Sequence, residues 1–63
     1  MKGFIVVHDE PMNNRLTFIK KKAIMSIAEN LKGRAVIAYG NDIVVETGEC
    51  LEDVMRMMRR EEL

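Results

Sequence analysis

The spacing of apolar residues changes several times along the chain, and it predicts both strands and a helix. Residues 4–8 form a run rich in β-branched side chains, which is typical of a strand. Residues 9–14 indicate a turn, because Pro11 fixes one φ angle and Asn13 and Asn14 tolerate a positive φ. From Leu51 the apolar residues recur every three or four positions, with acidic residues early and arginines late, which predicts a C-terminal helix.

A β-hairpin is predicted in the second half of the chain. Residues 34–39 and 42–47 are two further runs typical of strands, and they flank Gly40-Asn41. This residue pair favours a tight two-residue turn. We expect Gly48 to end the second strand of the hairpin.

Residues 15–31 fit two different structures. As a helix, the segment places five residues on one apolar stripe: Leu16, Ile19, Ala23, Ile27 and Leu31. In that case Gly33 follows at a position that commonly ends helices. As strands, the segment consists of residues 16–19, a polar break at the three lysines 20–22, and residues 23–27. Periodicity alone does not choose between the two structures, and local propensity slightly favours the helix.

Five short stretches match the pattern of a known family. They are FIVV at 4–7, FIKKKAIMSI at 18–27, AVI at 35–37, IVV at 43–45 and ECLEDV at 49–54. Their order over nearly the whole chain resembles the FlbD-like family of small bacterial flagellar-operon proteins and their short relatives. Cys50 stands where the family has a helix-capping serine, and the spacing around the hairpin differs by a residue or two.

The resemblance implies that residues 15–27 are extended, and it brings no enzymatic activity or catalytic residues with it. We therefore predict a single α+β domain over residues 1–63. It is expected to be a small antiparallel β-sheet of four to five strands with one C-terminal α-helix. The alternative is a βαββα fold in which residues 15–31 are helical.

Length and composition predict self-association. A chain of 63 residues buries only about 60% of the surface of its unfolded form, and such chains usually need a disulfide, a metal or a partner chain. A single cysteine, Cys50, excludes an intrachain disulfide, and a single histidine, His8, excludes a zinc site of the usual Cys/His kind. Because 48% of the residues are hydrophobic, we expect a homo-oligomer.

The C-terminal helix is the predicted interface of this homo-oligomer. Residues three and four apart share a helix face, and Met57 lies beside the resulting stripe, where we expect it to be exposed in a monomer. Methionine is suited to such an adaptable contact. The predicted interface residues are Leu51, Val54, Met55, Met57 and Met58.

The sequence predicts neither an enzyme nor a cofactor or metal site. His8, Asp9 and Glu10 are adjacent, but we interpret them as a solvated strand end, because no second histidine is available to complete a site. Cys50 precedes the helix, where thiols gain reactivity, but we interpret it as a small residue at a cap position. Glycine-rich phosphate-binding loops are absent from the sequence.

Basic residues leave a second function open. Ten basic and ten acidic residues balance, whereas dedicated nucleic-acid binders are usually basic. Four basic residues are nevertheless candidate nucleic-acid contacts: Lys20, Lys21, Lys22 and Arg34. Residues 18–58 also bear a partial resemblance to the β-rich LytTR DNA-binding domain. A third hypothesis is a viral or mobile-element accessory protein that sequesters a partner or ligand.

The expected function is that of a small, non-enzymatic interaction or regulatory protein that acts as a homo-oligomer and binds an unidentified protein partner. Apolar runs are far shorter than the ~20 residues of a membrane span, so no membrane association is expected. The start of the chain lacks the features of a signal peptide, and a single free cysteine fits a reducing compartment. We expect a cytoplasmic protein.

Overall fold

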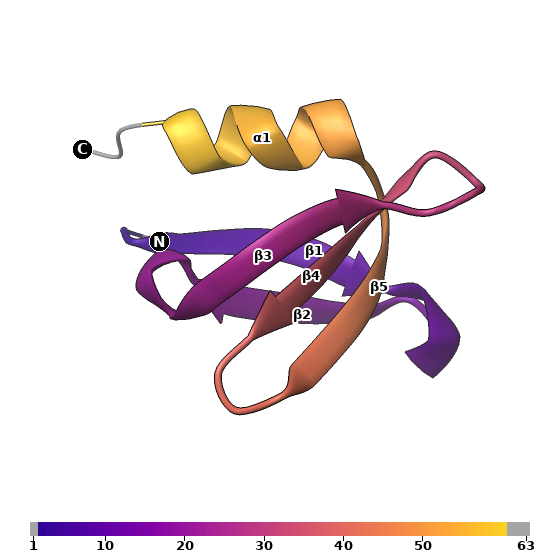
Figure 1. Ribbon diagram of the computed structural model, residues 1–63, viewed down its shortest axis with the longest axis horizontal. Coiled ribbons are helices and arrows are strands. Elements are labelled where there is room, and N and C mark those ends of the chain that lie inside the picture. Colours follow the sequence, from indigo (N-terminus) through magenta and orange to yellow (C-terminus); the bar gives the residue numbers. More distant parts are fainter. Residues whose placement is uncertain (1, 61–63) are drawn as a thin grey trace.

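Strands occupy most of the chain in the computed structural model, which describes residues 2–60 (Figure 1). The described elements are β1 (Phe4–Asp9), η1 (Glu10–Met12), β2 (Arg15–Lys20), η2 (Lys21–Ala23), β3 (Ile24–Glu29), β4 (Arg34–Tyr39), β5 (Ile43–Cys50) and α1 (Leu51–Arg59). The predicted α+β fold, with an antiparallel sheet and one C-terminal helix, is confirmed. The βαββα alternative is wrong, because residues 15–20 and 24–29 are strands.

The contested segment is extended because both of its halves find apolar partners across strands. Ile19 lies opposite Ile5, and Ile27 lies opposite Ile37. The helical stripe would instead have required Leu16 and Leu31 to be buried, and both are exposed. The lysine triplet falls at the junction between the two strands, and η2 begins at Lys21, as the strand alternative requires.

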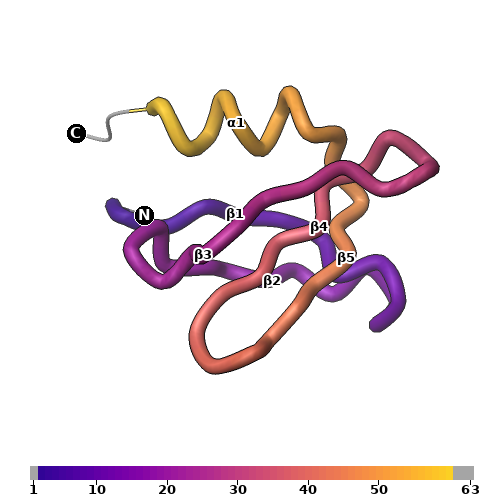
Figure 2. The backbone as a smooth tube through the Cα atoms, viewed as in Figure 1, coloured from indigo at the N-terminus to yellow at the C-terminus, as the bar shows by residue number. Residues whose placement is uncertain are grey.

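The sheet has the strand order β2-β1-β5-β4-β3 and consists of two parts. β1 and β2 pair along their whole length, from Phe4↔Lys20 to Asp9↔Arg15. β3, β4 and β5 form the second part, and among residues 2–60 the pair Asp9↔Thr47 alone joins β1 to it. Because one pair is their only ladder contact, β1 and β2 cross the other strands at a large angle (Figures 1 and 2).

The core lies between the strands and α1. Alternate residues of the strands point towards the helix, as period-two alternation requires. The helix crosses this side of the sheet and packs on β1, β3, β4 and β5. The buried apolar residues are Ile5, Val7, Ile19, Ala35, Ile37, Val45 and Val54. We refer to this side of the sheet as the inner face and to the opposite side as the outer face.

The turns follow the sequence with two corrections. Asn13 and Asn14 have φ angles of 64° and 58°, which confirms the predicted turn. The hairpin loop is longer than the two residues predicted, because Tyr39 pairs with Ile43 and leaves residues 40–42 in the turn. Gly48 does not end the last strand. β5 continues to Cys50 through a register shift in its pairing with β4.

Candidate interaction surface

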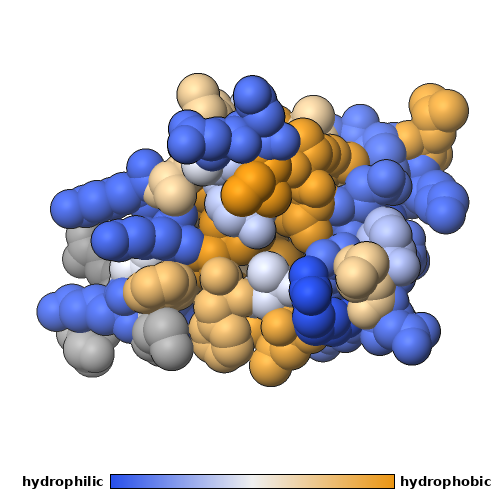
Figure 3. Space-filling model, turned by 90° about the horizontal axis from the view of Figure 1, so that it is seen from below, coloured by the Kyte–Doolittle hydropathy of each residue, from blue (hydrophilic) through white to orange (hydrophobic). Residues whose placement is uncertain are grey.

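Apolar side chains gather on the outer face, on the side of the sheet that α1 does not cover. Leu16, Phe18 and Val44 are 54%, 46% and 62% exposed. The space-filling view of the side away from α1 shows hydrophobic side chains at its centre and charged ones around them (Figure 3). The outer-face apolar residues are Phe4, Val6, Leu16, Phe18, Val36, Ala38 and Val44.

Strand pairing explains how these residues come together. Residues directly opposite each other in an antiparallel pair point to the same face. Val6 therefore shares the outer face with Phe18, and Ala38 shares it with Val44. The first pair belongs to β1 and β2 and the second to β4 and β5, so each part of the sheet contributes an apolar cluster to the outer face.

Most of the apolar stripe of α1 packs against the core of the same chain. Val54 is fully buried, and Leu51, Met57 and Met58 pack against the core, whereas Met55 is 37% exposed. The expectation that Met57 is exposed is wrong. Successive helical residues turn by about 100°, so Met57 lies only about 60° from Val54, whereas Met55 lies about 100° from it on the other side. The buried stripe is thus centred on Val54, and Met55 is left at its edge.

The start of α1 is only partly capped. Cys50 occupies the N-cap position and makes no side-chain hydrogen bond to the first turn. Glu52 and Asp53 lie in that turn, where carboxylates are favoured by the helix dipole, and both pair with Arg56. These pairs are exposed on the helix surface.

The structure does not bring the predicted nucleic-acid contacts into one patch. Lys20, Lys21 and Lys22 lie where β2 passes into β3. Arg34 begins β4 and lies beyond the far end of β3, roughly 20 Å away along a strand of this length. Its guanidinium donates a hydrogen bond to the Gly48 carbonyl at 3.0 Å. Arg34 therefore stabilises the pairing of β4 with β5.

Lys21 is also engaged within the protein. Its backbone N–H donates to the Gly3 carbonyl at 2.8 Å, and its Nζ donates to the Arg60 carbonyl at 2.8 Å. The second contact places a positive charge at the carboxyl end of α1, where the helix dipole favours it. Lys20 and Lys22 are exposed and remain available at this end of the sheet.

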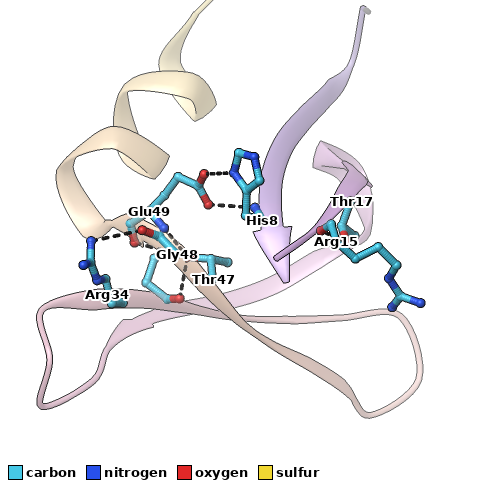
Figure 4. A network of polar contacts seen from close by, with 8 residues as sticks. His8, Arg15, Thr17, Arg34, Thr47, Gly48 and Glu49 are labelled. Atoms are coloured by element: carbon cyan, nitrogen blue, oxygen red, sulfur yellow. Dashed lines mark hydrogen bonds and ion pairs between the residues drawn. The ribbon is translucent and has the colours of Figure 1, made fainter. Parts of the chain in front are cut away.

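The adjacent residues His8, Asp9 and Glu10 do not form a cluster. His8 points to the outer face, where its Nδ1 lies 2.6 Å from Glu49 Oε2 and its backbone N–H donates to Glu49 Oε1 at 2.9 Å (Figure 4). Asp9 is buried on the inner face and accepts a hydrogen bond from Arg15 at 3.1 Å. Consecutive strand residues point to opposite faces, so these side chains diverge.

The contacts of His8 with Glu49 and the ladder pair between Asp9 and Thr47 hold the two parts of the sheet together. Glu49, from β5, supplies two contacts to β1 next to the single ladder pair. Thr47 is fully buried, and its hydroxyl donates to the Ala35 carbonyl at 2.8 Å and accepts from the Glu49 N–H at 3.3 Å. This network fastens β1, β4 and β5 where the parts cross (Figure 4).

These features define a small α+β domain whose most prominent surface is an uncovered apolar sheet face. Comparison with known proteins adds no identity, because no family model, curated protein or solved structure matches the chain. Within residues 2–60, three or more potential metal ligands do not gather at any point. None of the described helices is both long and apolar enough to cross a membrane.

Sequence reasoning missed the outer face and the partner of His8. The alternation in β1 and β5 places apolar residues on both faces, which was a signal that one helix could not cover them all. The contact between His8 and Glu49 had no such signal, since 41 residues separate the two in the chain.

Proposed function

We propose that this chain is a small, non-enzymatic interaction protein that works as a homo-oligomer and covers its outer face in doing so. The observation that carries the proposal is the set of exposed large apolar side chains on that face, Leu16, Phe18 and Val44. Contiguous exposed apolar surface of this kind is typical of a contact with another protein surface.

A second copy is the proposed occupant because of the size of the domain. A chain of 63 residues with one cysteine has no intrachain disulfide to support its small core, and burial of apolar side chains against another chain is a further source of stability. Burying a fully exposed large apolar side chain contributes about 1.5–3 kcal/mol, so covering each of these side chains, which are about half exposed, contributes roughly half of that. Covering the outer face in two copies therefore yields a contribution on the scale of a small domain's whole stability.

The proposed role is regulatory or scaffolding rather than catalytic. The candidate acid–base residues diverge, and Cys50 has no histidine beside it in the described contacts. The resemblance to the FlbD-like family points to a bacterial protein, and the single free cysteine fits the cytoplasm. An unidentified protein partner completes the proposal.

Nucleic-acid binding is the second candidate, and it rests on one observation. The contact of Lys21 Nζ with the Arg60 carbonyl brings one further basic residue, from the end of α1, beside the lysine triplet. The balanced total charge weighs against this candidate. A salt-dependent DNA shift that Lys22→Glu abolishes, and that Lys32→Glu leaves unchanged, would support it.

Light scattering coupled to size exclusion tests the homo-oligomer. At low micromolar concentration we expect a mass that is a multiple of 7.3 kDa. Phe18→Lys and Val44→Lys should lower this mass, because each places a charge on the outer face. Met55→Lys is the control on the helix, at a position that is 37% exposed.

The outcomes separate the two proposed surfaces. If the wild-type protein has a mass of 7.3 kDa at these concentrations, the homo-oligomer is rejected. If Met55→Lys lowers the mass and the two outer-face variants do not, the helix is the interface, as the sequence predicted.

A further inference from the structure

β3 has a free edge, and the pairing of β3 with β4 shows which of its backbone N–H and C=O groups point to that edge. The sheet order places β3 at one edge, and beyond it the Asn30 N–H donates to the Arg34 carbonyl at 2.9 Å. Opposite residues of an antiparallel pair alternate between bonded and non-bonded positions. Ala28 is therefore bonded to Val36 on β4. Ile27 and Glu29 point their N–H and C=O groups away from β4, towards the free edge.

This edge carries little of the protection that free strand edges usually have. Charged side chains, especially lysine, prolines and bulges are the common means of blocking an edge. β3 has a register irregularity near Met25, but from Ser26 to Ala28 it contains no charge and no proline. Ser26 and Ala28 are small and exposed, and within residues 2–60 no strand pairs with the far side of β3.

We propose that β3 pairs with β3 of a second copy in antiparallel orientation, so that two sheets join into one continuous sheet across a two-fold axis. The proposal rests on the proposed homo-oligomer and names a surface that builds it. With the axis at Ala28, Ile27 of each copy lies opposite Glu29 of the other, and each such pair exchanges both of its N–H···O bonds. Ala28 then faces its own counterpart at the closest approach, where its small side chain fits.

In a self-pairing centred on Phe18, charge disfavours β2, the other edge of the sheet. Lys21 N–H donates to the Gly3 carbonyl, so by the same alternation Phe18 points its backbone groups to the free edge of β2. Self-pairing about Phe18 places Arg15 of each copy opposite Lys21 of the other. Directly opposed like charges are destabilising. In the β3 pairing Glu29 lies opposite an isoleucine and Asn30 lies opposite a serine, so no like charges are opposed.

A disulfide tests the register directly. Residues opposite each other at a non-bonded position have Cα atoms about 4.5 Å apart, which is within the range that a disulfide spans. We expect Ala28→Cys, in a Cys50→Ser background, to oxidise to a covalent dimer of twice 7.3 kDa. Lys32→Cys in the same background is the control, because Lys32 is exposed but lies outside β3.

The expected difference in rate is large. Paired strands raise the effective concentration of the facing thiol from the micromolar to the millimolar range, so Ala28→Cys should cross-link about a thousandfold faster than Lys32→Cys. Equal rates for the two variants would overturn the register centred on Ala28.

A second pair of variants tests the edge without a cross-link. Glu29→Pro removes an N–H that points to the free edge, and proline is tolerated at such positions of edge strands. The variant should keep its circular dichroism spectrum and halve the mass of the assembly. Glu29→Ala removes the same side chain but keeps the N–H, so it should retain the full mass.

The results distinguish this inference from the proposed function. A wild-type mass of 7.3 kDa rejects both. A wild-type oligomer whose mass survives Glu29→Pro, and in which Ala28→Cys cross-links no faster than Lys32→Cys, rejects the β3 pairing and leaves the homo-oligomer standing through another surface.

Discussion

Val44 and Val45 are neighbours in β5 with identical side chains, yet one is 62% exposed and the other 4%. They belong to the two faces of the same sheet. The inner face is closed by α1, and a mostly apolar core fills the space between them. The outer face carries apolar residues at the same spacing but has no covering element among residues 2–60. Hydrophobic alternation is therefore present on both faces, and only the position of the helix makes one of them a core.

This difference separates residues that hold the fold from residues that remain available for contact. A buried apolar side chain contributes to stability in a single copy of the chain, whereas an outer-face side chain contributes only when another surface covers it. The two classes should respond differently to matched substitutions, and the following predictions use pairs of identical residues for that reason.

The largest difference is expected between two isoleucines. Ile37→Ala removes a fully buried side chain and should lower the free energy of unfolding by roughly 2–5 kcal/mol, because it leaves a cavity in the core. Ile43→Ala changes a residue that is on the same face of the sheet but is 48% exposed, and it should cost less than about 1 kcal/mol. Urea unfolding followed by circular dichroism at one fixed protein concentration measures both. Equal losses would mean that burial of Ile37 against the core contributes no more to stability than the half-exposed position of Ile43.

A hydroxyl placed on the two neighbouring valines sharpens the comparison. Val45→Thr buries a polar group among apolar side chains and should cost about 1–3 kcal/mol. In the dissociated chain Val44→Thr leaves its hydroxyl in water, so at a protein concentration where the assembly has dissociated it should keep the unfolding midpoint within the error of the measurement. A destabilised Val44→Thr protein that dissociates on unfolding would show that the outer face is already covered in solution.

The buried hydroxyl of Thr47 forms hydrogen bonds where the two parts of the sheet cross, and its contribution to stability can be tested. Thr47→Val keeps the shape of the side chain but leaves the Ala35 carbonyl and the Glu49 N–H without the hydroxyl, so about 1 kcal/mol of stability should be lost. Thr17→Val is the control, because the Thr17 hydroxyl bonds the Arg15 carbonyl at an exposed position. Thermal melts compare the two variants. If Thr17→Val costs as much as Thr47→Val, the buried network has no special role.

The smallest expected effect is a gain. Cys50→Ser places a good hydrogen-bond acceptor at an N-cap that has no side-chain bond, and it should stabilise the fold by about 0.5–1 kcal/mol. The gain should appear in urea unfolding while the mass of the assembly stays the same. A loss of function in this variant, with the fold retained, would instead indicate a reactive thiol.

Much of the fold could be predicted from the sequence, because the signals are local. The β-branched runs marked β1, β4 and β5, and the change of period at Leu51 marked α1. Residues 15–31 were ambiguous, because the apolar residues there fit both the helical and the strand period. They form strands in the structure, where Ile19 pairs with β1 and Ile27 pairs with β4. The loop at residues 40–42 was predicted one residue too short, because the pairing of Tyr39 with Ile43 sets its length.

The candidate surface was less predictable than the fold. The helix stripe was recognised, but its orientation was not, so Met57 was expected at the surface and instead packs against the core. The apolar stripe that the spacing predicts is wider than one residue at each helical turn. A small rotation of the helix about its axis therefore decides which side of the stripe is buried. Arg34 and the lysine triplet were grouped by charge, although a whole strand separates them.

The sequence by itself determined the alternation of the strands, the start of the helix and the residues able to adopt a positive φ, because each depends on the chemistry of a few consecutive residues. The tertiary structure alone decided which face of the sheet is covered, that β1 meets β5 at a single pair, and that Glu49 contacts His8. These outcomes depend on where α1 docks and on how far the sheet twists. Both result from contacts between residues far apart in the chain, which the period of the sequence does not encode.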